Sequence, residues 1–388
     1  MEALRAFVKE HKNKRPPRMA PSGKLRVFSD CAGISSELIA LRLLGLTSEH
    51  MDFVGGSEMD ATKRCMMQCV HRECHMPTNG NAVEKDLFHR SLEATQASDL
   101  YIAGFPCPAY SALGKKKGAQ DGKGRGLLVF EGLKYIAKWK PSVVVLENVA
   151  GFLNKKHQST HKVMKKTFAA LKYKVYMKVL NSKEHGVPNS RSRVYFVALR
   201  SAAKVQVHFR FPKPLPQCSK LVHFLDVSEK GEEKLDLASY EEKYGKGIWT
   251  ENVVLDVGSS AKWQSKTRDD VCPCLTRGRC LQKGYYLPRQ LRRLSGVECA
   301  RLQGVPTQLY GAMVAFLRRK SKHSTEEAAE KQVMGVLGDS MSINVLMRLL
   351  PLALSSVSLW PKTVKMRDPW SKVSPGKDAA EMVDKLWA

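Results

Sequence analysis

The sequence lacks any apolar run of the length that a membrane helix needs, about 20 residues, so we expect no membrane partner. It also lacks a secretory signal, because its start, MEALRAFVKEHKNKRPPR, puts basic residues and prolines after a weak apolar stretch. No internal repeat is found. A length of 388 residues, 43% of them hydrophobic, is enough for one large domain and a smaller one. We therefore expect a globular intracellular protein.

Cysteine is present, but no familiar metal-binding spacing is. The chain has ten cysteines, which in an intracellular protein are expected to be reduced. The cluster CMMQCVHRECH, residues 65–75, matches none of the usual structural zinc patterns. Cys65 and Cys69 lie one helical turn apart, so a buried helix face explains them. The pair in CPC, residues 272–274, is weaker still. We predict no metal site.

Acidic residues are scarce relative to basic ones. The chain has 64 Lys and Arg against 37 Asp and Glu, a formal net charge of +27. Such an excess favours a polyanionic partner, because neutralised phosphates release their counterions. A basic tail on a neutral enzyme would give the same total, but here the charge is spread along the chain, as in GKKKGAQDGKGRG, NKKHQSTHKVMKK, RQLRR and FLRRKSK. We therefore predict that the partner is a nucleic acid.

Strand and helix patterns alternate through the first half of the chain. Residues 1–23 are expected to be a flexible basic leader. From residue 24 to 200, apolar strand patterns alternate with helical ones, which predicts an α/β domain with a doubly wound sheet. The strand patterns are KLRVFSD, MDFVGGSE, SDLYIAGF, SVVVLENV, KYKVYMKVLN and SRVYFVALR. One of them, SVVVLENV, is an uninterrupted apolar run, as in a sheet covered on both faces.

The regular alternation stops after Arg200. Residues 201–270 carry FPKPLPQ and EKGEEKLDLASYEEKYGKG without clear periodicity, which fits a small recognition domain or a loop-rich insert. We expect a second, smaller domain over 201–325. A helical pattern over 326–356 is expected to complete the first domain, and 357–388 to form a polar tail with a few apolar anchors.

The first strand-to-helix turn, FSDCAGISSE, lacks the three spaced glycines of a dinucleotide fingerprint, so NAD is not predicted. Gly33 still allows a close approach of the backbone to a ligand. An acid at the end of the second strand, Glu58, is placed to accept both ribose hydroxyls of an adenosine, and Asp86 to meet its amino group. Both acids are equally compatible with helix capping.

The segment YIAGFPCPAYSALG places Cys107 between two prolines at the end of a buried strand. A cysteine with a lowered pKa is a strong nucleophile, and lysines of the following loop, GKKKGAQDGKGRG, can lower it and contact phosphates. A buried structural cysteine is the more common case, but such residues sit in the middle of an element. We therefore interpret Cys107 as a candidate nucleophile.

Two later strands bring further polar groups to the same edge. LENV ends a strand with Glu147, which in a pocket can stay protonated and donate to a ring nitrogen. NSRSRVYF places Arg191 and Arg193 on one face at strand spacing, and an arginine fork suits a carbonyl oxygen or a phosphate.

The order of these segments resembles the successive motifs of cytosine-5 methyltransferases. The resemblance covers about residues 25–200 and 270–350, with the blocks FSDCAGISSE, SEMD, GFPCPAYS, LENVAGF, NSRSRVYF, LSGVECARLQGVP and GDSMS. It implies a Rossmann-like catalytic domain with a target-recognition domain at 201–270, S-adenosylmethionine as cofactor and DNA as substrate.

The resemblance also implies roles for single residues. Cys107 would attack C6 of a cytosine flipped out of its helix, Glu147 would act at N3, Arg193 would bind O2, and Arg191 would support the site. The residues implied to bind the cofactor are Ala32, Gly33 and Ile34 at the turn, Glu58 and Met59 at the ribose, Asp86 at the adenine, and Pro106, Asp339 and Ser340 at the methionine end.

This chain departs from the family pattern at several positions. The first motif is short of glycines, and Pro108 and Asn189 replace glutamines, while Asp339 stands where Asn is common. No reacting group is lost, so we predict an active DNA methyltransferase. A tRNA methyltransferase on the same scaffold is the runner-up, although the Cys-Phe-Thr tripeptide of that branch is absent. A silent nucleic-acid-binding homologue is the third interpretation. We expect a monomer, in the nucleus if the source is eukaryotic and otherwise in the cytoplasm.

Overall fold

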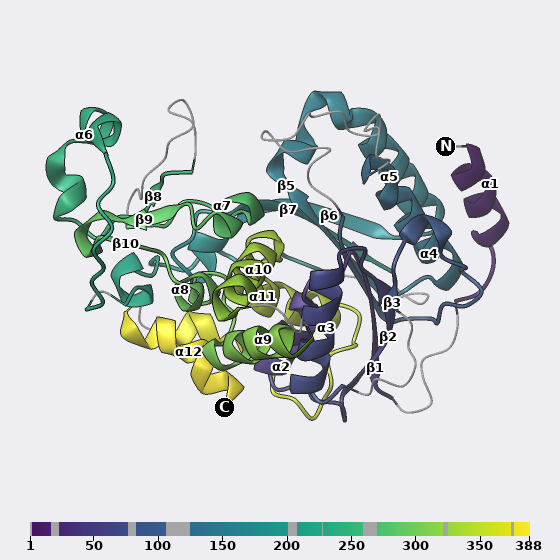
Figure 1. Ribbon diagram of the computed structural model, residues 1–388. Coiled ribbons are helices and arrows are strands. Elements are labelled where there is room, and N and C mark those ends of the chain that lie inside the picture. The colour runs from purple at the N-terminus through teal and green to yellow at the C-terminus, as the bar shows by residue number, and fades with distance from the viewer. Residues whose placement is uncertain are drawn as a thin grey trace.

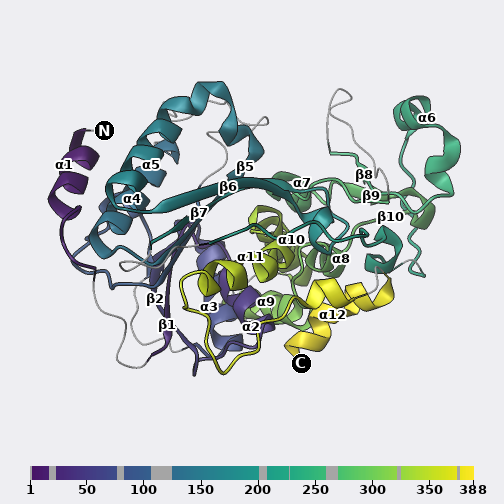
Figure 2. The ribbon, with the colours of Figure 1, turned by 180° about the vertical axis from the view of Figure 1, so that it is seen from behind.

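The computed structural model describes residues 2–16, 23–76, 83–105, 125–200, 208–226, 228–258, 270–320, 325–373 and 376–388. A central sheet is covered by helices on both faces, and a smaller lobe projects from one end (Figures 1 and 2). This confirms the predicted α/β class with a second, smaller unit.

The central sheet has seven strands in the order β3-β2-β1-β4-β5-β7-β6. Its strands are β1 (Leu25–Asp30), β2 (Met51–Ser57), β3 (Val83–Glu84), β4 (Leu100–Gly104), β5 (Val143–Val149), β6 (Lys174–Asn181) and β7 (Ser192–Leu199). The first five strands in this order are parallel, and most of their valines and leucines are buried by helices on both sides. Strand β7 is antiparallel to both neighbours, β5 and β6. All six predicted strands are present.

Helices cover the two faces of the sheet unequally. One face carries α2 (Ser36–Leu43), α3 (Ala61–Glu73), α8 (Gly296–Arg301), α9 (Thr307–Lys320), α10 (Glu326–Asp339) and α11 (Ile343–Ser355). The other carries α1 (Glu2–His11), α4 (Leu128–Trp139) and α5 (Gln158–Ala170). The single helix expected over 326–356 is two helices, because the backbone is extended at Ser340, before α11 begins.

The expected flexible leader contains an ordered helix. In α1, Leu4 and Val8 are one turn apart and both buried against the face that carries α4 and α5. The buried Lys140 donates its ammonium to the carbonyl of His11, at 2.7 Å, which satisfies the carboxyl end of the helix. The expectation of flexibility is therefore wrong for residues 2–11, because the amphipathic stripe is long enough to dock.

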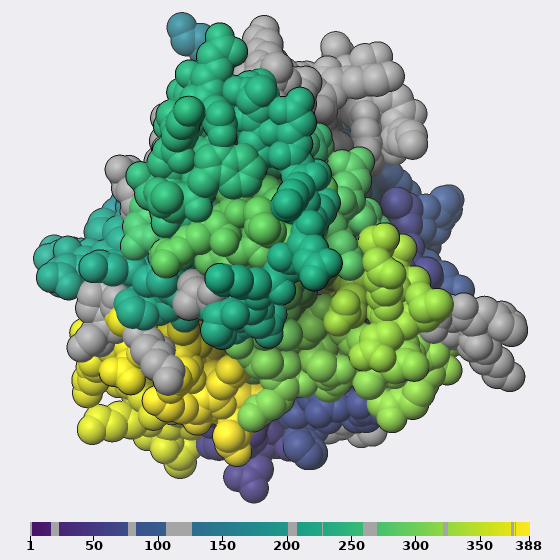
Figure 3. Space-filling model, turned by 60° about the vertical axis from the view of Figure 1, so that its left-hand side comes forward, coloured from purple at the N-terminus to yellow at the C-terminus, as the bar shows by residue number. Residues whose placement is uncertain are grey.

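The smaller lobe has its own three-stranded sheet and core. It contains α6 (Ala238–Tyr244), β8 (Leu255–Asp256), β9 (Tyr285–Leu287) and β10 (Arg292–Arg293), packed around Leu237, Tyr240, Ile248, Val253, Leu255 and Tyr286. Figure 3 shows it standing above the helices of the main body. Helices α8 and α9, which we expected within this domain up to residue 325, instead pack in the main core against α3 and α10. Their apolar faces are too large for the small core.

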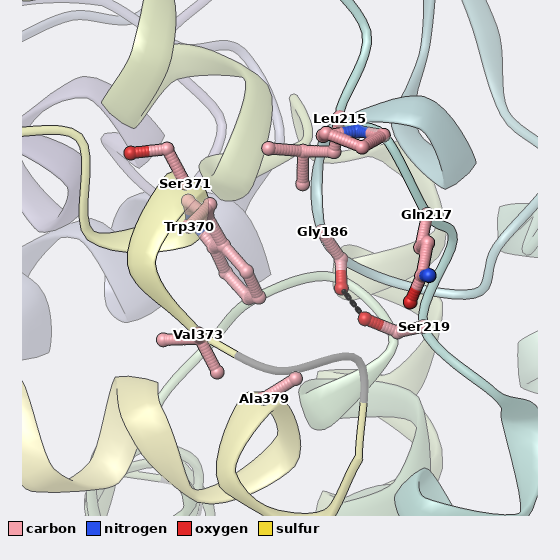
Figure 4. A pocket seen from close by; sticks show the side chains of 9 residues that line it. Gly186, Leu215, Gln217, Ser219, Trp370, Ser371, Val373 and Ala379 are labelled. Atoms are coloured by element: carbon pink, nitrogen blue, oxygen red, sulfur yellow. Dashed lines mark hydrogen bonds between the residues drawn. The ribbon is translucent and has the colours of Figure 1, made fainter.

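The carboxyl-terminal segment is packed rather than a free tail. Helix α12 (Lys377–Trp387) buries Ala379, Met382 and Val383, and Trp370 is buried just before it. A cavity of about 160 Å³ lies between this segment and residues 215–219, as Figure 4 shows. None of the predicted site residues lines it.

The remaining short elements connect these parts. They are α7 (Arg277–Leu281) and single 3-10 turns at Leu87–His89, Arg125–Leu127, Ala150–Leu153, Lys155–His157, Ser182–His185, Leu221–Phe224, Lys246–Trp249, Pro288–Gln290 and Pro369–Lys372. Within the described ranges, no single helix is both long and apolar enough to cross a bilayer, and α10 with α11 meets those criteria only as a pair bent by 42°.

Candidate active site

The carboxyl ends of β1, β4 and β5 meet at one point of the sheet edge. The surroundings of Gly104, the last residue of β4, show how closely these strand ends approach one another. A Cβ added there would lie 2.9 Å from Cε of Met341, 3.8 Å from Oε2 of Glu147 and 3.9 Å from the carbonyl oxygen of Cys31. Segments far apart in sequence therefore converge beside Glu147, as the sequence predicted for this edge.

Glu147 and Arg193 form a buried ion pair at this edge. Nε of Arg193 lies 3.3 Å from Oε1 of Glu147, and their side chains are 12% and 6% exposed. The pair exists because β7 runs antiparallel to β5, which brings the start of one strand to the end of the other and pairs Arg193 with Val149. Burial raises the pKa of Glu147, against the lowering effect of Arg193 and Arg191, so that the net pKa is above the ordinary value. Such a carboxyl group is suited to hold a proton.

Arg191 has different partners from Arg193. It precedes β7, and its guanidinium donates to three carbonyl oxygens, of Leu275 at 2.8 Å, Gly338 at 3.0 Å and Ser340 at 2.6 Å. Strand β7 begins at Ser192, directly after Arg191, and the charges of both arginines act on Glu147 and on Cys274, so the two guanidinium groups lie at the same edge. Arg191 clamps the chain at 275 and 338–340, which agrees with the supporting role implied for it.

The turn after β1 leaves room for a ligand. Gly33 has a φ of +61°, and a Cβ added to it would meet nothing within 4 Å. Its amide donates to Oε2 of Glu58, at 2.8 Å, and the amide of Asp60 donates to Oε1, at 2.9 Å. Ala32 is nearly buried and bonds to β2 through its amide, while the side chain of Ile34 is fully buried. Of these two residues, only backbone groups can face a ligand.

Met59 directly follows Glu58, whereas Asp86 lies on the segment after β3. The carboxylate of Asp86 accepts a hydrogen bond from the amide of Phe88, at 2.9 Å, and lies 2.8 Å from Nδ1 of His89, so it caps the turn at Leu87–His89. The side chain of Met59 is 71% exposed, an unusual position for a large apolar group. The amide of Glu58 donates to the carbonyl of Glu84 in β3, which places Asp86 two residues beyond this contact. An acid, an exposed apolar side chain and open space at a glycine turn together fit the adenosine part of S-adenosylmethionine. The structure therefore brings Gly33, Glu58 and Met59 together, while the carboxylate of Asp86 caps its own turn.

Asp339 joins this group through two cations that the sequence did not reveal. Its carboxylate lies 3.0 Å from Nζ of Lys63 and 3.4 Å from Nη1 of Arg277, which also pairs with Asp60 at 2.7 Å. Ser340 turns its hydroxyl back to the carbonyl of Leu337, at 2.8 Å. No local pattern marks Lys63 or Arg277, because their partners lie far away in sequence.

Cys107 and Pro106 lie outside the described residues. The last described residue before them, Phe105, accepts a hydrogen bond at its carbonyl from Nδ2 of the buried Asn148, at 3.1 Å. This bond ties the end of β4 to β5 directly beside Glu147. Strand β4, which precedes Cys107 in the sequence, therefore ends at the predicted edge.

A second cysteine borders the arginines. Sγ of Cys274 lies 3.9 Å from Nη1 of Arg191. Burial raises the pKa of Cys274, but the positive charges of Arg193 and Arg191 outweigh it and bring the pKa below the ordinary value. The spacing in CPC suggests at most a weak metal ligand and does not reveal this contact with arginine. Within the described ranges, no group of three or more metal-binding side chains is assembled.

A buried polar network behind the cofactor turn was also missed. Asp30, at the end of β1, lies 2.6 Å from Nη1 of Arg90 and accepts a hydrogen bond from the hydroxyl of Tyr101, at 2.7 Å. Asn189, where the family has glutamine, is buried and donates to the carbonyl of Leu302, at 3.1 Å. The sequence signal for the network was Asp30, an acid at the end of a strand whose other residues are mostly buried.

Known proteins resemble this chain over most of its length. Type II methyltransferase M.HhaI of Haemophilus parahaemolyticus is 28% identical over 344 residues, which are 84% of this chain and 98% of that protein. M.Bsp6I of Bacillus sp. (strain RFL6) is 28% identical over 231 residues, 57% of this chain and 72% of its own.

Solved structures share the fold. The Dnmt2 methyltransferase of S. pombe has a TM-score of 0.54 at 19% identity, covering 86% of this chain and 99% of its own. A putative DNA modification methyltransferase encoded in an E. coli prophage has a TM-score of 0.57 at 16% identity, with the same two coverages. Because the family model of the C-5 cytosine-specific DNA methylase matches residues 31–350, the chain belongs to this family of S-adenosylmethionine-dependent enzymes, which methylate cytosine in DNA.

Proposed function

We propose that the chain methylates a cytosine rotated out of duplex DNA, with Cys107 as nucleophile and the Glu147–Arg193 pair as the groups that hold the base. Extrusion is required because C5 and C6 cannot be reached while the base is stacked. The single observation that carries the proposal is the buried pair at 3.3 Å, at the edge where the segment with Cys107 begins. An acid with a raised pKa beside a fixed guanidinium matches N3 and O2 of cytosine.

The pair has separate tasks in the reaction. Arg193 donates to O2, while protonated Glu147 donates to N3, so electron density moves toward the ring nitrogen as Sγ of Cys107 bonds to C6. The electron pair of the C5–C6 double bond then becomes available at C5. After C5 has gained a methyl group, loss of its proton to a base restores the double bond and expels the thiolate of Cys107.

Residues at the turn would hold S-adenosylmethionine, which supplies an electrophilic methyl group when it is bound. Glu58 would accept the ribose hydroxyls, Met59 would cover the adenine ring, and Asp86 would receive its amino group. The backbone at Ala32, Gly33 and Ile34 would line the turn. Pro106, Asp339 and Ser340 would border the methionine end.

The test is methyl transfer from labelled S-adenosylmethionine to duplex DNA and, side by side, to tRNA. We expect label in DNA. We also expect a duplex with 5-fluorocytosine to form a stable adduct, since fluorine at C5 blocks the final elimination, and its peptide to contain Cys107. Label in tRNA with none in DNA would overturn the substrate, and transfer without an adduct would overturn the role of Cys107.

Replacing Asp339 with Asn should shift the pH profile of methyl transfer to lower pH. The charge of Asp339 raises the pKa of Glu147, so its removal lowers that pKa, and protonated Glu147 is then lost at a lower pH. The side chain is 38% exposed, so the free energy of unfolding should change by no more than about 1 kcal/mol. kcat/KM measured against pH checks the shift. The same change at the distant Asp378 is the control, and a profile that moves upward would contradict the prediction.

The location and oligomeric state stay predictions: a monomer, in the nucleus if the source is eukaryotic and otherwise in the cytoplasm. The target sequence would be read by the smaller lobe.

A further inference from the structure

One stretch of the chain is strongly basic and contains no acid. Between Asn148 and Lys183 the sequence has nine lysines and neither Asp nor Glu, although 37 of the 388 residues are acidic. The stretch begins directly after Glu147, so the charge lies in the part of the chain that follows the candidate active site.

Helix α5 displays much of this charge on one side. Its buried stripe is Thr160, Met164, Thr167 and Phe168, and the opposite side exposes lysines. We call the following set the basic face: Lys155, Lys156, Lys162, Lys165 and Lys166. Within the described chain, no hydrogen bond or ion pair engages any of these five ammonium groups. Their positive charge is thus available to a partner.

The arrangement costs the isolated protein stability. Lys162 lies three and four residues before Lys165 and Lys166, and like charges at this spacing destabilise a helix by about 0.2–0.5 kcal/mol a pair. The positive charge of the lysines also acts on a neighbouring side chain. The pKa of His157 is lowered, mainly by burial and secondly by the charge of Lys156. A polyanion bound here would relieve this repulsion.

The basic face is attached to the active site by aromatic packing. The ring of His161 in α5 lies 4.5 Å from that of Phe152, which lies 5.3 Å from Phe105 at the end of β4. Figures 1 and 2 show α5 and the smaller lobe toward opposite ends of the molecule, with β5 between them. DNA with its target cytosine at Glu147 therefore has the smaller lobe on one side and α5 on the other.

We propose that the basic face binds phosphates of duplex DNA flanking the target cytosine, on the side away from the smaller lobe. This rests on the proposed function only in taking duplex DNA as the substrate. A helix of 13 residues is about 20 Å long, which corresponds to about six base pairs. Contacts to phosphate carry no sequence information, so they lengthen the footprint without narrowing the target.

The experiment compares the full-length wild type with Lys162→Gln, Lys165→Gln and Lys166→Gln combined. A matched control combines Lys362→Gln, Lys365→Gln and Lys372→Gln, three exposed lysines of the carboxyl-terminal segment with the same total charge. Fluorescence anisotropy gives the affinity for labelled duplexes of about 12 and about 40 base pairs with the same central sequence, over a series of salt concentrations. Thermal unfolding checks that both variants fold as the wild type does.

For the longer duplex, we expect the α5 variant to bind about ten- to a hundredfold more weakly near 0.1 M salt. The plot of log K against log salt should also be less steep, with a slope that is less negative by about 2 to 3. For the shorter duplex, the affinities of variant and wild type should agree. Three results would overturn the proposal: an α5 variant whose salt dependence on the longer duplex equals that of the wild type, an equal loss of affinity for both duplexes, or an equal loss of affinity in the control variant. Binding is measured without methyl transfer, so an inactive enzyme would refute the proposed function and leave this test intact.

Discussion

Replacing Glu147 with Gln should lower kcat/KM for DNA by about 10²- to 10⁴-fold, the usual contribution of a positioned proton donor. The carboxyl group is 6% exposed and lies 3.3 Å from Arg193, and burial raises its pKa. Glutamine keeps the size and an oxygen that can accept from Arg193, but it has no acidic proton for N3. The change therefore removes the proton transfer while the local packing is retained.

The pH profile separates this role from simple loss of structure. Because Glu147 acts in its protonated form, activity in the wild type should fall as pH rises through its raised pKa, and this limb should be absent in Glu147→Gln. The variant Cys107→Ser gives the background activity of an enzyme without its nucleophile. The matched control is Glu93→Gln, a change at a side chain that is 82% exposed. A variant with more than a tenth of wild-type activity and an unchanged profile would refute the assignment.

The sequence predicted the edge at which the site lies but not the direction of the strand that carries Arg193. Strand patterns SVVVLENV and SRVYFVALR read the same in either direction, so nothing in them shows that β7 runs against β5. The signal was in the connection. Only about ten residues join β6 to β7, without a helix, and a parallel crossover needs a dozen or more residues and usually a helix. An antiparallel β7 brings its first residues to the end of β5, where Arg193 pairs with Val149, two residues after Glu147.

Other parts of the site depend on contacts that no local pattern encodes. Lys63 and Arg277 meet Asp339 and Asp60 across more than two hundred residues of sequence. The close approach of α10 to α7 is of the same kind: a Cβ on Gly338 would lie 2.5 Å from the carbonyl carbon of Thr276. Such pairings follow from the packing of the whole core. The contact between α10 and α7, for example, forms only when both helices are packed against the rest of the core.

Removing the charge of Arg90 should have a large effect on stability. Arg90 and Asp30 are 4% and 1% exposed at the side chain, with 2.6 Å between Nη1 and Oδ1, and Tyr101 donates to the other oxygen. Arg90→Leu would leave a buried carboxylate without its cation, which costs about 3–5 kcal/mol of the free energy of unfolding. Urea unfolding measures this loss, and Arg72→Leu, at a surface arginine 50% exposed, is the control.

The network also connects two parts of the candidate cofactor site. Asp30 lies two residues before Ala32, and Arg90 ends the turn that begins at Asp86 and spans Leu87–His89. The guanidinium lies 5.5 Å and 5.4 Å from the ring centres of Phe28 and Tyr135, which fixes it between β1 and α4. Arg90 therefore holds the segment of Asp86 at a fixed distance from the turn at Gly33.

Replacing the whole network with apolar groups distinguishes this positioning role from stability alone. In the combined variant Asp30→Leu, Arg90→Met and Tyr101→Phe no charge is left unpaired, so most of the free energy of unfolding lost in Arg90→Leu should return. Cofactor affinity should not return with it, because a methionine side chain cannot fix the segment of Asp86 by hydrogen bonds. We expect S-adenosylhomocysteine, measured by calorimetry, to bind about tenfold more weakly than to the wild type, about 1.4 kcal/mol. If the combined variant binds it as tightly as the wild type does, the network stabilises the fold and has no part in placing the cofactor.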